Sequence, residues 1–256
     1  MKYKYRVIRA KSAVIAAAGL AICILISVAG GISKSITAWS PSAKHPIYSV
    51  ETGDANVALT INCAWGNDDI PELLSILKQY NIKATFFIVG DWCDKFPESV
   101  ELISAAGHEI GSHSDTHADM TRLNDEDILR EIEVSRAKLQ KTAGVPVTMF
   151  RPPSGAYNDR VVELIRDCGM YPVQWDCDSI DYKNPSPETM RERIIKKIKN
   201  GSIMLFHSGA DNTPAALPLV IEAVTAKGYT FVSMSKLVHE PPYTVDMQGR
   251  QHEGKG

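Results

Sequence analysis

Two histidines spaced four residues apart are the strongest chemical signal in the sequence. His113 and His117 lie in a polar segment, 111–117, that directly follows a strand-like run. If this segment turns helically, residues i and i+4 share one face and present two imidazoles to a single cation. A solvated polar loop is the alternative. Because Ser, Asp and Thr surround the pair, packing of the imidazoles in an apolar core is a weaker explanation.

A proline-rich turn at 150–155 is a second candidate. Pro152, Pro153 and Gly155 fix a tight backbone there, after another strand-like run. Such a turn directs backbone N–H groups toward a developing oxyanion, and the Arg151 guanidinium suits a nearby carboxylate. An ordinary strand-to-helix loop explains the same residues.

Carboxylates and a histidine follow two further strand-like runs. Asp176, Asp178 and Asp181 fall within six residues, and three carboxylates at such a position require solvent, a partner or a metal. His207 follows the apolar run 203–206, where it either donates a proton while an aspartate holds it or simply ends the strand. Because all the candidates follow strands of one pattern, their coincidence indicates a shared site.

Seven apolar runs of strand length alternate with helical patterns along the chain. The strand-like runs are 57–61, 84–89, 109–112, 148–151, 171–175, 202–206 and 230–232. Helical spacing marks 125–141, which Asn124 is placed to cap, then 159–168, 187–199, 214–227 and a segment that begins near Pro71. This alternation predicts a mainly parallel α/β sheet, whose functional groups gather at the carboxyl ends of the strands.

The N-terminal segment is typical of a membrane anchor. Residues 13–32 are apolar or small and uncharged, a length that crosses about 30 Å of hydrocarbon as a helix. Basic residues are concentrated before this stretch, which predicts a single-pass protein of the cell membrane with a cytoplasmic N-terminus. We expect a basic segment at 1–11, the anchor at 12–33, a linker at 34–54, an extracytoplasmic domain at 55–238 and a flexible tail at 239–256. A formal net charge of −2 gives no strong attraction to nucleic acid.

Taken in order, these segments resemble the motifs of the polysaccharide deacetylase family, also called the NodB homology domain or carbohydrate esterase family 4. The likeness covers about 56–237. It includes 83–90, which is similar to the family's K-A-T-F-F-x-x-G strand, and 107–113, which matches the approach to its metal-binding histidines. The resemblance implies a distorted (β/α) barrel with about seven parallel strands, preceded here by the transmembrane helix. It also implies a divalent metal, usually zinc, and an acetylated amino-sugar polysaccharide as substrate.

The resemblance assigns a role to each candidate residue. It implies that the two histidines bind the metal and that an arginine holds the catalytic base. Two aspartates match the family's D-S-x-D element, and a further histidine matches its L-x-H motif and acts as the acid. A backbone N–H in the proline turn helps to bind the oxyanion, and two apolar side chains wall the acetyl pocket. These residues are His113, His117, Arg151, Asp178, Asp181, His207, Ser154, Trp175 and Leu205.

The chain departs from the family pattern at the first motif, T-F-D-D-G. Asn62 falls on the position of the base, and its amide does not accept a proton as a carboxylate does. Cys63 falls on the position of the third metal ligand. A zinc thiolate, a buried inert thiol, and recruitment of Asp68 or Asp69 as ligand or base all remain open, and the two aspartates equally suit a helix cap. The substituted motif resembles that of the sporulation-associated branch of the family.

Three functions are compatible with these residues. The first is a metal-dependent hydrolase that removes N-acetyl groups from an envelope polysaccharide such as peptidoglycan. The second, suggested by Asn62 and Cys63, is a catalytically impaired relative that binds glycan or acts as a sporulation factor. The third is an O-acetyl esterase, because the same chemistry cleaves esters with less demand on a base. Protein partners are not predicted by the sequence.

Overall fold

The computed structural model describes residues 44–254. The predicted anchor at 12–33 lies outside the described residues. From residue 44 to residue 254, no helix combines the length and the apolar character needed to cross a bilayer.

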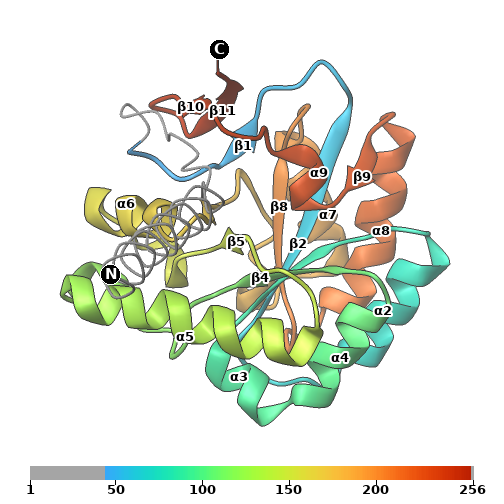
Figure 1. Cartoon of the computed structure of the whole chain (residues 1–256). Helices are drawn as coiled ribbons and strands as arrows, with labels where there is room; N and C mark the ends of the chain where they lie inside the picture. The colour runs from blue at the N-terminus through green and yellow to red at the C-terminus, as the bar shows by residue number, and fades with distance from the viewer. Residues whose placement is uncertain (1–43, 255–256) are drawn as a thin grey trace, which may run out of the picture. The chain divides into compact units, whose positions relative to one another are not determined.

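A parallel sheet forms the centre of the described residues (Figure 1). Seven strands lie along it in the order β6-β5-β4-β3-β2-β8-β7, and β9 also pairs with β2. Their bounds, in chain order, are β2 (Asn56–Cys63), β3 (Thr85–Ile88), β4 (Glu109–Ser112), β5 (Met149–Phe150), β6 (Tyr171–Pro172), β7 (Cys177–Asp178), β8 (Ile203–His207) and β9 (Thr230–Val232). The parallel α/β prediction is confirmed, and the seven strands form a half-barrel, which is the distorted (β/α) barrel that the resemblance implied.

One strand of this parallel sheet was not predicted. A single strand was predicted over 171–175, whereas the chain forms β6 at one edge of the sheet and β7 at the opposite edge. Each of these strands has two residues, which is too short for a period-two hydrophobic pattern to reveal.

Helices cover the outer side of the sheet (Figure 1). They are α2 (Ile70–Gln79), α3 (Gly90–Lys95), α4 (Pro97–Ala105), α5 (Asp125–Ala143), α6 (Asp159–Asp167), α7 (Pro187–Lys197) and α8 (Thr213–Ala226). The short helix α9 (Met234–Leu237) instead packs in the apolar cluster on the other face of the sheet. The predicted cap of α5 is confirmed, because the Asn124 side chain accepts a hydrogen bond from the backbone N–H of Asp127 at 2.9 Å. The sequence pattern missed α3 and α4, which are short and are divided at Pro97.

Alternation along β2 decides which side chains reach the site. Leu59, Ile61 and Cys63 pack in the large apolar cluster that includes the helices, while Ala58 belongs to a second cluster on the other face. Successive side chains of a strand point to opposite faces. Asn62 therefore faces away from the helix layer, and its neighbour Cys63 faces into it.

A second, small sheet joins the two ends of the described chain. It consists of β1 (Ser49–Val50), β11 (Arg250–Glu253) and β10 (Tyr243–Val245), in that order. Tyr243 and Val245 are buried, and so is Val50. The C-terminal residues as far as 254 thus differ from the predicted flexible tail. Their apolar positions are few and separated by polar residues, and their burial comes from packing with distant residues such as Tyr171, which stacks on Tyr243.

Candidate functional site

The carboxyl ends of four parallel strands bring the predicted site residues together. In the register of β2 and β8, Asn62 lies opposite His207. The backbone N–H of His113, just after β4, bonds the carbonyl of Ile88 at 2.9 Å, and that of Arg151, just after β5, bonds the carbonyl of Ser112 at 2.8 Å. Because parallel strands end at one edge, residues far apart in the sequence meet there.

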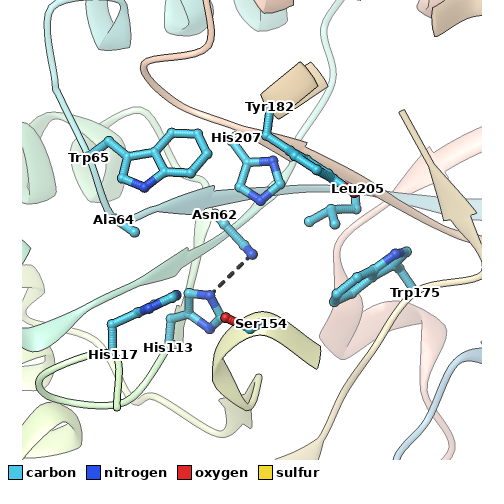
Figure 2. Close-up of a pocket in the computed structure, with 10 residues that line it drawn as sticks. All are labelled: Asn62, Ala64, Trp65, His113, His117, Ser154, Trp175, Tyr182, Leu205 and His207. Carbon is cyan, nitrogen blue, oxygen red and sulfur yellow. Dashed lines mark hydrogen bonds between the residues drawn. The ribbon is translucent and has the colours of Figure 1, made fainter. Parts of the chain in front are cut away.

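A pocket of about 290 Å³ opens among these strand ends. Figure 2 shows the two histidines of 111–117 on one side, His207 with two aromatic rings on the other, and Asn62 between them. Seven predicted site residues line the pocket, and three lining residues had no predicted role. The full lining is Asn62, Ala64, Trp65, His113, His117, Ser154, Trp175, Tyr182, Leu205 and His207.

The histidine pair is held by a turn and not by a helix. The ring centroids of His113 and His117 lie 4.9 Å apart, and Ser114 and His117 adopt left-handed φ values of 67° and 61°. The Glu131 carboxylate, from α5, accepts the backbone N–H groups of Asp115 and Thr116 at 2.8 Å each and so fixes the turn. Burial lowers the pKa of both histidines below 6.5, that of His113 far below, and the neighbouring imidazole lowers the pKa of His113 further. His113 is therefore neutral at physiological pH.

Arg151 is fully buried beneath the pocket, yet it holds an amide where the resemblance implied a carboxylate. Its guanidinium donates to Asn62 Oδ1 at 2.8 Å and to the carbonyl of Gln174 at 3.1 Å. The guanidinium carbon also lies 3.9 Å from the centroid of the Phe87 ring. Gly111 permits this ring position, since a Cβ there would come within 2.7 Å of Phe87. Burial lowers the pKa of Arg151 to about 9, so the side chain keeps its charge at neutral pH.

On the opposite side, His207 is held by a carboxylate. Its Nδ1 lies 2.7 Å from Asp181 Oδ1, and its backbone N–H donates to Asp181 Oδ2 at 2.6 Å. The hydroxyl of Thr213 donates to the same carboxylate at 2.8 Å. Such an aspartate fixes the tautomer and the orientation of an imidazole that transfers protons. Asp178, the other predicted carboxylate, accepts from the backbone N–H of Ile180 at 2.8 Å and is not among the residues that line the pocket.

Two aromatic side chains enclose His207. Trp65 stacks on its ring with centroids 5.2 Å apart and 19° between the planes, and Tyr182 meets it edge-on at 5.7 Å. About half of each side chain is exposed, 49% for Trp65 and 48% for Tyr182. Sequence reasoning gave neither a role, nor one to Ala64. The available signal was their position, immediately after a strand or beside the D-S-x-D element.

Ser154 lies on the histidine side of the pocket in a left-handed turn, with a φ of 55°. The ring centroid of Trp175 lies 5.5 Å from the Arg151 guanidinium carbon, and Leu205 lies on β8. These placements bring all three residues to the walls of the pocket.

The three candidates for a third metal ligand lie elsewhere. Cys63 packs in the apolar cluster, and burial raises the pKa of its thiol to about 12, so it stays protonated. Asp68 and Asp69 line a separate pocket, and Asp69 Oδ2 accepts from the backbone N–H of Gly209 at 2.8 Å. Asp69 occupies the N-cap position of α2 without a side-chain cap bond.

A metal centre requires more ligands than the pocket offers. Within 44–254, no group of three or more His, Cys, Asp or Glu side chains is placed to hold a metal ion. His113 and His117 lack the third ligand that would complete a three-residue catalytic zinc site, and the remaining imidazole of the pocket, His207, is paired with Asp181. The residues present therefore do not fit such a centre.

Comparison with known proteins gives three sequence findings. A family model described as polysaccharide deacetylase matches residues 49–173. The uncharacterized protein YlxY of Bacillus subtilis is 34% identical over 196 residues, which are 77% of this chain and 61% of YlxY. A peptidoglycan-N-acetylglucosamine deacetylase of Bacillus cereus is 31% identical over 196 residues, which are 75% of this chain and 92% of that enzyme. The chain thus spans less than two thirds of YlxY and most of the Bacillus cereus protein.

Among solved structures, wild-type BA3943 is similar to this chain and is described as a CE4 family pseudoenzyme from Bacillus anthracis. It shares 34% sequence identity at a TM-score of 0.74, and the match covers 76% of this chain and 69% of that one. A BA3943 mutant described as having restored enzymatic activity matches at the same TM-score and identity.

Proposed function

The chain belongs to the polysaccharide deacetylase family, and on that premise we propose that its pocket binds an acetylated amino-sugar polysaccharide of the cell wall while hydrolysing it slowly or not at all. The similarity to a peptidoglycan-N-acetylglucosamine deacetylase supports the choice of ligand. The similarity to a pseudoenzyme supports the loss of hydrolysis.

One observation carries the proposal. Of the ten described residues that line the pocket, none bears a carboxylate, and the position expected for the base is Asn62. An amide does not take a proton from water at neutral pH, and general-base catalysis typically contributes about 10²–10⁴-fold to a rate. Hydrolysis that depends on such a base is reduced accordingly.

The groups that contact a ligand are retained. The apolar faces of Trp65, Trp175 and Leu205 suit the methyl group and ring carbons of an acetylated sugar, and Ser154 and His117 supply polar groups. A volume of about 290 Å³ admits one sugar unit with its acetyl group. The exposed faces of Trp65 and Tyr182 leave room for neighbouring units of a polymer.

A second candidate, N-acetyl hydrolysis, is favoured by the intact His207–Asp181 pair. These residues are placed to protonate a leaving amine, and they would serve the leaving alcohol of an O-acetyl ester in the same way. Under this candidate a group outside the described pocket lining supplies the missing base.

The experiment that tests the proposal combines binding with acetate release. We expect tetramers of N-acetylglucosamine to bind more tightly than the same tetramers without acetyl groups, and Trp175→Ala to weaken binding at least tenfold, about 1.4 kcal/mol. Leu102→Ala is the control, because Leu102 is exposed on α4 and does not line the pocket. Rapid acetate release by wild type favours hydrolysis instead, and equal affinity for both tetramers contradicts the proposed ligand.

The cellular setting is part of the proposal. A single-pass anchor at 12–33 would hold the domain on the extracytoplasmic face of the cell membrane, beside its polymer. The resemblance of the first motif to the sporulation-associated branch supports a use in spore formation. Protease treatment of intact cells should remove the domain, and protection of the domain contradicts this location.

A further inference from the structure

The histidine side of the pocket contains a closed ring of three hydrogen bonds. Arg151 donates from its guanidinium to Asn62 Oδ1 at 2.8 Å. Asn62 Nδ2 lies 3.2 Å from His113 Nε2, the bond that is dashed in Figure 2. His113 Nδ1 lies 2.7 Å from the backbone carbonyl oxygen of Arg151, which returns the ring to its first residue.

The donor in each bond follows from chemistry. A guanidinium only donates, so it faces the amide oxygen of Asn62 and leaves the NH₂ group to face His113. A backbone carbonyl only accepts, so Nδ1 of His113 carries the proton and Nε2 carries the lone pair. The Asn62 amide therefore donates to that lone pair. Asn62 is 4% exposed and His113 is 2% exposed, so solvent does not compete for these groups.

The lone pair on His113 Nε2 is the one that would bind a metal. A zinc ion sits about 2.0–2.1 Å from a histidine nitrogen, along the direction of its lone pair. The Asn62 amide group occupies that direction at His113 Nε2 and is held there by Arg151. Zinc binding would therefore require breaking a buried bond and reorienting a residue that a buried cation fixes.

We propose that the Asn62 amide takes the place of a metal ion at His113, so that this pocket binds its ligand without a metal. The inference rests on the proposed function, because it concerns the same pocket and the same acetylated ligand.

The residue at position 62 decides whether the pocket favours a metal ion or a hydrogen bond at His113. An aspartate there would place a carboxylate oxygen opposite Nε2, and two acceptors at that distance require a proton or a cation between them. An asparagine carries its own donor to the same point. Ala64 lines the pocket beside the histidines and contributes no ligand atom, whereas an aspartate at 64 would add a second carboxylate.

The test measures zinc affinity of the full chain in mild detergent, after treatment with EDTA and its removal, by competition with a colorimetric chelator. We expect wild type to bind zinc weakly and substoichiometrically. Asn62→Asp, and more so Asn62→Asp with Ala64→Asp, should bind at least about tenfold more tightly. Asn67→Asp is the matched control, because it makes the same chemical change outside the pocket lining, where Asn67 bonds Ser99 Oγ at 3.0 Å.

Two results would overturn the inference, and neither depends on the folding of the Asn62 or Ala64 variants. One is a stoichiometric zinc ion that is lost in His113→Ala. The other is loss of binding to the N-acetylglucosamine tetramer when EDTA is added, where we expect a change of less than about twofold. Failure of the tetramer to bind under any condition refutes the proposed function, while the zinc titration still decides the inference.

Discussion

The two sides of the pocket each hold an imidazole in place, but they use different groups to do so. On one side a buried carboxylate, Asp181, holds the imidazole of His207. On the other side a neutral amide, Asn62, links a buried arginine to the imidazole of His113. The first arrangement is suited to proton transfer, whereas the second contains no carboxylate that could accept a proton from water. Loss of hydrolysis therefore requires a change on one side only.

The largest expected effect is on the carboxylate side. Asp181→Ala removes the acceptor of His207 Nδ1, of Thr213 Oγ and of a backbone N–H, all of them poorly solvated. We expect a loss of about 3 kcal/mol in the free energy of unfolding, measured by urea denaturation. Asp178→Ala is the control and should cost less than about 1 kcal/mol, since its carboxylate bonds a nearby backbone N–H at a partly exposed position. Equal losses in the free energy of unfolding for the two variants would contradict the stronger structural role of Asp181.

The amide side should be less sensitive to truncation. Asn62→Ala leaves the buried Arg151 with its bond to the Gln174 carbonyl and its contact with Phe87, so we expect a loss of about 2 kcal/mol. Asn67→Ala should cost about 1 kcal/mol or less, because its partner Ser99 is not a buried cation. If both asparagine variants unfold at the same urea concentration, the ring around Arg151 contributes no stability.

The smallest expected effect comes from His252, which does not line the pocket, and it depends on pH. His252 bonds Asp246 and Glu51 at 2.9 Å and 2.7 Å, and these carboxylates raise its pKa above 6.5 in the folded protein. Its stabilisation is therefore complete below about pH 6.5 and is lost as the pH rises through the raised pKa. His252→Gln should lower the melting temperature at about pH 5.5 more than at about pH 9, with tetramer binding unchanged. A larger fall in melting temperature at about pH 9 than at about pH 5.5 would contradict this prediction.

Much of the fold could be predicted from hydrophobic runs, since long buried strands such as β2 and β8 carry continuous apolar residues. The two-residue strand β7 and the sheet that joins β1 to β11 could not, because their partners lie elsewhere in the chain. Among the site residues, most of those at or directly after strands were found, whereas Ala64 and Trp65, which follow β2, were not. The opposite directions of Asn62 and Cys63 follow from strand alternation, which could have weakened Cys63 as a ligand at the start.

The bond between Asn62 and His113 was beyond sequence reasoning. The two residues are 51 positions apart, and their contact depends on the register of three neighbouring strands. The roles of Trp65 and Tyr182 were hidden for a similar reason. Trp65 lies in the loop after β2 and Tyr182 in a short 3-10 helix, and only the shared end of the sheet brings them to His207.

The most direct measurement is a crystal structure of the wild-type protein grown with zinc, with diffraction data recorded at the zinc absorption edge. An amide-capped His113 predicts no anomalous peak about 2.0–2.1 Å from its Nε2 and an Asn62 amide still within hydrogen-bonding distance. A peak bound by both His113 and His117, with Asn62 turned away, would contradict the account.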